Sequence, residues 1–113
     1  SGVALIEGNR GLYDGIDLDG TTSTAELAKL LGAPVVMCVD CTKTTRTMAA
    51  VLSGCARFDP QVAIRGVILN RVAGARHESI LRRSIEHLSV KQRSPFKKSF
   101  MPSRRHSLQT ASL

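Results

Sequence analysis

The sequence lacks any hydrophobic run long enough to cross a membrane. Its uncharged apolar stretches are far shorter than the roughly 20 residues that a transmembrane helix needs. No charged amino-terminal region followed by an apolar segment is present, so we expect no export signal. Aromatic residues are also scarce, at 4% with no Trp, in a composition that is otherwise that of an ordinary globular protein. At 113 residues the chain forms one domain at most.

Cysteine is infrequent, and we expect the three cysteines to be reduced thiols. Cys38 lies within an apolar run, and Cys55 lies on a helical stripe of apolar residues. Cys41 has no histidine or other base spaced to support nucleophilic catalysis. Thiols in such positions are typical of a reducing compartment. The sequence therefore predicts a cytoplasmic protein.

Acidic residues are absent from the end of the chain, where positive charge gathers. The formal charge is +7, from 16 Lys and Arg against nine Asp and Glu. Residues 91–113 hold six of the basic residues and no acidic one, so the rest of the chain is close to neutral. The body offers no basic face by composition, and we do not expect it to bind nucleic acid. In the tail, Phe96 and Phe100 could stack on single-stranded bases.

Three apolar runs predict the strands of a parallel sheet. They are Val3–Ile6, Pro34–Val39 and Val62–Leu69. All three are rich in β-branched residues, and none alternates cleanly between apolar and polar residues. This pattern is typical of strands that are covered on both faces.

Helical patterns follow each of these runs. Thr24–Leu31 consists of strong helix formers, with Ser23 as the expected N-cap and Gly32 as the expected stop. Thr44–Arg57 and Ala75–Leu88 each place apolar residues on one helical face. The residues of these two stripes are Met48, Val51, Leu52 and Cys55, then Leu81, Ile85 and Leu88. The order of elements predicts an α/β fold in which helices cross over between parallel strands.

A polar residue stands at the end of each expected strand: Glu7, Asp40 and Asn70. The carboxyl ends of parallel strands share one edge of the sheet, and ligands bind there. Strand ends also meet solvent, and Asp and Asn are common turn residues. The preference for a site is strongest at Glu7, because the glycine-rich loop Gly8–Gly15 follows it and carries a second carboxylate, Asp14. Carboxylates beside such glycines predict a site for phosphate and Mg²⁺.

The usual phosphate-binding loop is missing from this sequence. No GxxxxGK[ST] pattern occurs anywhere, so neither the backbone cradle for phosphates nor its lysine is present. The chain also begins at Ser1, two residues before an expected core strand. We therefore expect it to be an excerpt of a longer protein.

Four linked segments carry a family resemblance. They are Leu5–Gly15, Ser23–Val36, Arg57–Pro60 and Gly66–Val72, the last of which is followed by Arg76 and His77. In this order and spacing they resemble the amino-terminal synthetase domain of the cobyrinic acid a,c-diamide synthase family. The resemblance implies a P-loop NTPase type of fold, of which residues 1–88 hold a partial parallel sheet with crossover helices. Residues 89–113 match the family poorly, and we expect a disordered basic tail there.

The resemblance implies an ATP- and Mg²⁺-dependent ligase of cobalamin biosynthesis. Such an enzyme phosphorylates the a and c carboxylates of cobyrinic or hydrogenobyrinic acid, and ammonia from glutamine then displaces phosphate. Glutamine is hydrolysed in a glutaminase domain that is absent from this sequence, and a homodimer is expected for the full-length family. We expect no membrane partner, and no synthetase activity from residues 1–113 alone.

The resemblance also implies roles for individual residues. Glu7 matches the Mg²⁺-binding carboxylate, Asp14 matches the loop aspartate needed for amidation, and Asn70 matches the asparagine that reads the adenine edge. These roles agree with the chemistry of the side chains, because Mg²⁺ offsets charge on a transferred phosphoryl group. An amide can donate to adenine and accept from it at once.

Further matched positions have more than one interpretation. Tyr13 could pack against the substrate or cover the strand end. Ser23 and Thr24 could donate to a substrate carboxylate or phosphate at a helix N-terminus, and Ser23 could also cap that helix. His77 and His87 are expected to be surface residues.

Two other functions remain as alternatives. One is a non-catalytic P-loop-like module whose basic tail binds nucleic acid. The other is a partitioning- or maturation-type ATPase of the same superfamily, which fits the expected sheet but not the loop Gly11–Gly15.

Overall fold

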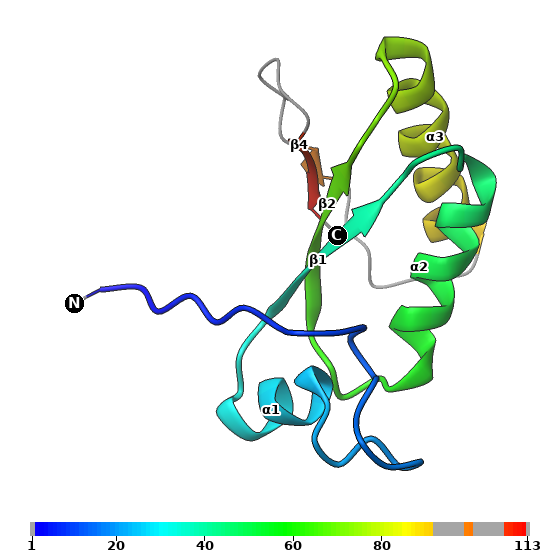
Figure 1. Cartoon of the computed structure of the whole chain (residues 1–113). Coiled ribbons are helices and arrows are strands. Elements are labelled where there is room, and N and C mark those ends of the chain that lie inside the picture. The colour runs from blue at the N-terminus through cyan, green and yellow to red at the C-terminus, as the bar shows by residue number, and fades with distance from the viewer. Residues whose placement is uncertain (1, 92–98, 101–107, 113) are drawn as a thin grey trace. The chain divides into compact units, whose positions relative to one another are not determined.

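A computed structural model describes the backbone of residues 2–91, 99–100 and 108–112, and the side chains of residues 2–87. The chain divides into two compact units, with the boundary between Ala33 and Pro34. Figure 1 shows the elements of both units. Each unit is described by itself below.

The amino-terminal unit contains the helix α1, Thr24–Leu31. Ser23 caps it as predicted, because its side-chain oxygen accepts a hydrogen bond from the backbone N–H of Glu26 at 3.3 Å. The helix ends at Gly32, whose φ of 60° lies in the left-handed region that glycine adopts at low cost. Both predicted ends of this helix are confirmed.

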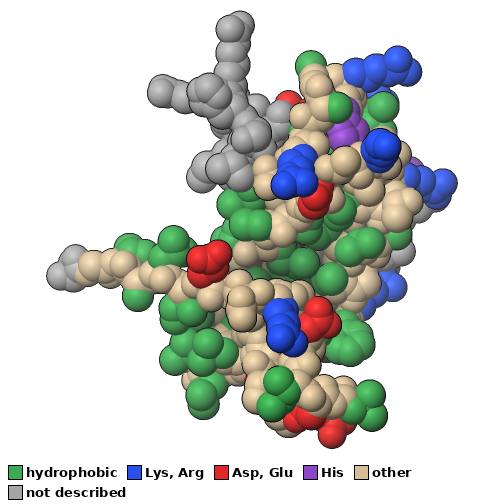
Figure 2. Space-filling view, viewed as in Figure 1, with side chains coloured by type: hydrophobic (Ala, Val, Ile, Leu, Met, Phe, Trp, Pro, Cys, Tyr) green, Lys and Arg blue, Asp and Glu red, His purple; other side chains and the backbone are tan. Residues whose placement is uncertain are grey.

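The predicted strand Val3–Ile6 is wrong. These residues form no regular structure, and the side chains of Val3 and Leu5 are each 97% exposed. A strand needs a neighbour that satisfies its backbone N–H and C=O groups. In the described part of the amino-terminal unit, α1 is the one regular element, so no strand is available for pairing. Figure 2 shows hydrophobic side chains exposed along this extended segment.

The carboxy-terminal unit begins with a βαβα arrangement, as predicted. Strand β1, Val35–Asp40, lies parallel to β2, Ile64–Asn70. Helix α2, Arg46–Phe58, connects them, and α3, Ala75–Lys91, follows β2. The fold is therefore α/β with a crossover helix between parallel strands, consistent with part of a P-loop NTPase-type domain.

Two short strands in the tail were not predicted. Strand β4, Leu108–Ser112, pairs antiparallel with β2, and β3, Ser99–Phe100, pairs with β4. The sheet order is β1-β2-β4-β3. Five of the six basic tail residues lie outside the described residues, so the predicted disorder and nucleic-acid contacts of this tail are not tested there. These five residues are Arg93, Lys97, Lys98, Arg104 and Arg105.

The core of this unit lies on one face of the sheet. Helices α2 and α3 pack there against β2, with Val67, Leu69 and Leu81 almost fully buried. The other members of this cluster are Cys41, Met48, Ala49, Leu52 and Ile85. Most of the predicted stripe residues are confirmed as buried, namely Met48, Leu52, Leu81 and Ile85. Val51 is 48% exposed, and the side chain of Leu88 lies outside the described ones. Figure 1 shows both helices on the same side of the strands.

The opposite face of β1 is not covered by any of the described residues of this unit. Exposure alternates along β1, with Val36 57% exposed and Cys38 also exposed. The expectation of strands covered on both faces is therefore wrong for β1. The apolar character of a run does not determine which of its residues face a helix, because successive side chains point to opposite faces.

In the described part of the chain, no helix has the length and the apolar composition needed to cross a membrane.

The one-sided core predicts unequal costs for the same substitution on the two faces. Val67→Ala should lower the free energy of unfolding by about 2–3 kcal/mol, because it removes two buried methyl groups and leaves a cavity. The matched control Val36→Ala removes the same groups from an exposed position in the neighbouring strand, so it should cost less than about 1 kcal/mol. Urea unfolding of the full chain measures both, and equal losses would contradict the assigned faces.

Candidate functional site

The glycine-rich loop of the amino-terminal unit lies against the start of α1. The backbone N–H of Ala25 donates to the carbonyl of Leu12 at 3.0 Å, and the N–H of Asp14 donates to the carbonyl of Gly11 at 3.0 Å. The first of these bonds ties the loop to the first turn of the helix, whose N–H groups have no partner within the helix itself, and the second closes a turn within the loop. The loop is therefore held by backbone contacts rather than by side-chain packing alone.

Two glycines allow close approach within this loop. A Cβ atom at Gly8 would lie 2.8 Å from the side chain of Thr24, and a Cβ at Gly11 would overlap the carboxylate of Asp14. Any larger residue at either position would displace one of the predicted site residues. Glu7 immediately precedes Gly8, the glycine whose backbone approaches the side chain of Thr24 at the start of α1.

The predicted site residues of this unit differ in exposure. Glu7 and Asp14 are exposed, Tyr13 and Thr24 are half-buried, and Ser23 is 4% exposed. The side chain of Ser23 is engaged by Glu26, so its capping role is confirmed. The expectation that Glu7 ends a strand is wrong, because no strand precedes it.

The described residues form no preformed metal cage. Among the described residues, no group of three or more His, Cys, Asp or Glu side chains is placed to enclose a metal ion. A protein cage for Zn²⁺ or Ca²⁺ is therefore not formed by these residues. Mg²⁺ needs less from the protein, since it usually keeps several waters and binds one or two carboxylates together with substrate phosphates. An exposed carboxylate such as Glu7 meets that requirement.

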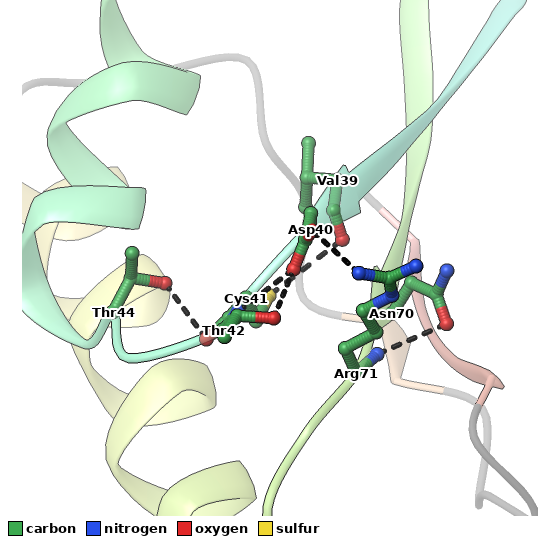
Figure 3. A network of polar contacts seen from close by, with 7 residues as sticks. All are labelled: Val39, Asp40, Cys41, Thr42, Thr44, Asn70 and Arg71. Atoms are coloured by element: carbon green, nitrogen blue, oxygen red, sulfur yellow. Dashed lines mark hydrogen bonds and ion pairs between the residues drawn. The ribbon is translucent and has the colours of Figure 1, made fainter.

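In the carboxy-terminal unit, the parallel register places Asp40 beside Asn70. These residues are register partners at the carboxyl ends of β1 and β2, so this part of the predicted polar edge is confirmed. Figure 3 shows a network around them that includes Thr42 and Arg71. Asp40 Oδ1 accepts from the backbone N–H of Thr42 at 2.9 Å and from its hydroxyl at 2.5 Å. Asp40 Oδ2 lies 3.5 Å from Arg71 Nη1.

These contacts favour the ionised form of Asp40. The hydroxyl of Thr42 contributes most to holding the pKa of Asp40 below its usual value, followed by the Thr42 N–H, and then by the charge of Arg71. The ion pair with Arg71 is exposed and long, which explains its small share. Asp40 therefore carries a negative charge at neutral pH beside the amide of Asn70.

The amide of Asn70 has a defined orientation. Its Oδ1 faces the backbone N–H of Arg71 at 2.9 Å, and because that N–H can only donate, the facing atom must be the oxygen (Figure 3). The amide nitrogen is thus directed elsewhere, where it can donate to a ligand. The backbone carbonyl of Asn70 also accepts from the N–H of Cys41 at 2.8 Å, which continues the strand pairing past Asp40.

A sequence signal was missed at Cys38 and Cys41, which have the spacing of a CxxC pair. Both thiols are free, and three Cα-to-Cα steps along extended chain separate Cys38 from Cys41 by about 10 Å, too far for a disulfide. Burial, followed by the charge of Asp40, raises the pKa of the Cys41 thiol. A raised pKa disfavours the thiolate, so Cys41 is suited to the core and not to nucleophilic chemistry.

Sequence reasoning also missed Thr42 and Arg71 as parts of the polar edge. Arg71 lies within a segment that carried the family resemblance, but no role was assigned to it. Its φ of 58° could not be foreseen, because a non-glycine residue in the left-handed region gives no compositional signal.

The chain belongs to the family described as AAA domain, whose sequence profile matches residues 1–96. Among curated proteins, it is 48% identical over 89 residues to the hydrogenobyrinate a,c-diamide synthase of Streptomyces coelicolor, covering 78% of this chain and 18% of that protein. It is 48% identical over 86 residues to the cobyrinate a,c-diamide synthase of Methanosarcina acetivorans, covering 75% of this chain and 17% of that protein.

A third relative is the cobyrinate a,c-diamide synthase of Magnetococcus marinus, 51% identical over 84 residues, which are 74% of this chain and 18% of that protein. The resemblance stated from the sequence is thereby confirmed. The chain spans less than a fifth of the length of these curated relatives. No solved structure matches it.

The Asp40 network predicts an order of effects on the pKa of this carboxyl. Thr42→Val should raise the pKa of Asp40 toward its usual value, and Arg71→Gln should raise it less, because the hydroxyl contributes more than the distant guanidinium. A carboxyl whose pKa is lowered by folding stabilises the fold above its unfolded value, near 3.8, and this contribution is lost as the pH falls through the folded pKa. Thr42→Val should therefore lose less stability on acidification than the parent chain.

Carbon-13 NMR titration of the Asp40 carboxyl measures the two pKa values directly. Urea unfolding at pH 7 and at pH 3 gives the corresponding stabilities. A larger rise of the pKa in Arg71→Gln than in Thr42→Val would contradict the order of contributions.

Proposed function

We propose that the chain is part of an ATP- and Mg²⁺-dependent enzyme that amidates the a and c carboxylates of cobyrinic or hydrogenobyrinic acid, with glutamine as the nitrogen donor. The observation that carries this proposal is the 48–51% identity to three enzymes named for that diamide synthesis. Membership in a family of AAA domains supports the use of a nucleotide. The pathway is then cobalamin biosynthesis.

The reaction needs activation because a carboxylate cannot expel oxide. A carboxylate oxygen attacks the γ-phosphorus of ATP, the bond to ADP breaks, and an acyl phosphate forms. Ammonia then attacks the acyl carbon, phosphate leaves with the electron pair of the C–O bond, and loss of a proton gives the amide. Phosphoryl transfer depends mainly on positioning and on charge stabilisation, which are tasks for the residues of a preformed edge.

Glu7 is proposed to hold Mg²⁺. Its carboxylate is exposed, so water and phosphate oxygens have room to complete the coordination. When bound, the ion would supply charge stabilisation to the transferring phosphoryl group. Glu7 itself would contribute a negatively charged oxygen ligand.

Asp14 is proposed to orient the substrate carboxylate or the attacking ammonia. Its backbone N–H is tied to the carbonyl of Gly11, which limits the motion of the loop near its carboxylate. Thr24 and Tyr13 are proposed substrate contacts, because both are half-buried at the junction of loop and helix. Ser23 is proposed to contribute through the N-terminus of α1 that it caps.

Asn70 is proposed to recognise the adenine of ATP. Its oxygen is held by the N–H of Arg71 and retains a second lone pair, while its nitrogen can donate two hydrogen bonds. Adenine offers an amino group beside a ring acceptor, and such an edge matches an amide that accepts and donates side by side. Guanine presents a carbonyl in place of that amino group and would face the amide oxygen unfavourably.

The remaining parts of the enzyme are proposed to come from outside this sequence. They are a phosphate-binding loop, a glutaminase domain that releases ammonia, and a second subunit of a homodimer. The three free thiols agree with a cytoplasmic location. On this proposal, residues 1–113 alone do not turn over ATP, and activity is sought in a hybrid enzyme.

The test uses the Streptomyces coelicolor enzyme with its matching 89-residue segment replaced by that of this chain. The hybrid should form diamide with ATP, Mg²⁺ and glutamine. In it, Glu7→Gln should lower kcat about 100-fold or more, because the side chain keeps its size but loses the charge that binds Mg²⁺. The matched control is Asp19→Asn, a second exposed carboxylate of the same unit. Unchanged amidation in Glu7→Gln would overturn the metal assignment, and an inactive, folded hybrid would overturn the proposed function.

Recognition of adenine predicts a change in nucleotide binding. In the hybrid, Asn70→Ala should raise KM for ATP about tenfold and leave kcat within about twofold, since contacts to the base are equal in the ground and transition states. The ratio of kcat/KM for ATP to kcat/KM for GTP should fall as well. The control is Gln61→Ala, another amide in the carboxy-terminal unit, placed before β2 and not after it. Steady-state rates over a range of concentrations of each nucleotide give both constants. An unchanged ratio of kcat/KM for ATP to kcat/KM for GTP would argue against this role of Asn70.

A further inference from the structure

His77, near the start of α3, contacts both loops that follow the parallel strands. Its Nδ1 accepts a hydrogen bond from the backbone N–H of Ala73 at 2.9 Å, in the loop after β2. Its Nε2 is hydrogen-bonded to the carbonyl oxygen of Thr44, in the loop after β1. His77 is half-buried, and both of its ring nitrogens are hydrogen-bonded.

These two partners determine the protonation of the ring. A backbone N–H can only donate, so Nδ1 must be an unprotonated acceptor. A carbonyl oxygen can only accept, so Nε2 must carry the proton. The contacts are satisfied together only by the neutral Nε2–H tautomer, which serves as an acceptor on one side and a donor on the other.

The two contacts of His77 close a path of hydrogen bonds and short chain segments that joins the two loops. The backbone N–H and the hydroxyl of Thr44 both donate to the carbonyl of Cys41, each at 3.1 Å. The N–H of Cys41 donates to the carbonyl of Asn70 at 2.8 Å. Asn70 leads along the chain to Ala73, which binds the other side of the imidazole. The side chain of His77 therefore connects the two loops beyond the last hydrogen bond between the strands.

Both loops contain a non-glycine residue in the left-handed region. Lys43 has a φ of 53° and Arg71 has a φ of 58°. Such conformations are unfavourable for residues with a Cβ, and they persist when surrounding contacts determine the backbone. The hydrogen bonds of His77 hold the backbone on the carboxyl side of each left-handed residue. Thr44 follows Lys43, and Ala73 lies two residues after Arg71.

We propose that His77 is a positioning residue that couples the loops after β1 and β2. By holding Thr44 and Ala73, it fixes the loop backbone on both sides of the polar edge, including the N–H of Arg71 that orients the amide of Asn70. Where this edge binds the base of a nucleotide, which rests on the proposed function, His77 acts through Asn70 and not by contact with the ligand.

The first test needs no substitution. In the full 113-residue chain labelled with nitrogen-15, long-range proton–nitrogen NMR spectra distinguish the tautomers of histidine. At a pH where both imidazoles are neutral, His77 should show the Nε2–H tautomer alone, while the exposed His87 of the same helix should show a mixture of the two neutral tautomers. A protonated Nδ1 on His77 would overturn the proposal, because it would place two N–H groups against each other.

The second test separates the two contacts with a pair of variants. In His77→Asn the side-chain oxygen can replace Nδ1 but cannot reach Thr44, whereas in His77→Gln the side-chain nitrogen can replace Nε2. The N–H of Ala73 should stay protected from hydrogen exchange in His77→Asn and lose about tenfold protection in His77→Ala. The amide signals of Cys41 and Thr44 should shift in His77→Ala and in His77→Asn, and less in His77→Gln.

The control for these variants is His87→Ala, which should leave the signals of both loops unchanged. If His77→Ala leaves the Ala73 exchange rate and the Thr44 signal as they are in the parent chain, the two loops are not coupled through His77 and the proposal fails.

A kinetic test addresses the consequence for the nucleotide. In the hybrid enzyme, His77→Asn should raise KM for ATP about threefold to tenfold with kcat within about twofold, and His87→Ala should change neither. A fall in kcat without a change in KM would contradict a role in positioning Asn70. If the parent hybrid is inactive, the proposed function fails, while the tautomer and exchange measurements still decide on the coupling.

Discussion

The parallel pairing of β1 with β2 is the interaction on which the described contacts of the carboxy-terminal unit depend. Its register brings Asp40 opposite Asn70, and it continues for one more hydrogen bond, from Cys41 to Asn70. Beyond that last bond, the segments that follow β1 and β2 diverge into separate loops and helices. Because α2 and α3 both pack on one face, the strands lie against one apolar layer, and their carboxyl ends present polar groups together.

The polar edge is organised by short-range hydrogen bonding more than by charge. Thr42 satisfies Asp40 within its own loop, and Arg71 satisfies the oxygen of Asn70 through its backbone. The ion pair between Asp40 and Arg71 is long and exposed, so it adds little. Backbone hydrogen bonding is also used in the amino-terminal unit, where the carbonyl of Leu12 attaches the loop after Glu7 to α1. In both units the backbone places the side chains proposed to act on a ligand.

Much of the fold could be predicted because its signals are local. The ends of α1 follow from a capping serine and a glycine, both of which act within one turn. The strands β1 and β2 and the stripes of α2 and α3 follow from apolar patterns that need no knowledge of their neighbours. Val3–Ile6 has the same kind of pattern but remains unpaired, since a strand exists only when another strand satisfies its backbone. The tail strands β3 and β4 are present but were not predicted, because their sequence carries no sustained apolar alternation.

The sequence by itself determined the order of elements, the caps of α1, the residue types available at Glu7, Asp14, Asp40 and Asn70, and the family to which the chain belongs. Tertiary structure decided which of these side chains meet. The nearness of Asp40 and Asn70 depends on a register between strands 30 residues apart in the sequence, and the bond of His77 to Thr44 joins residues 33 positions apart. Periodicity describes which face of an element a residue occupies, but contacts between elements arise when packing brings their backbones within hydrogen-bonding distance.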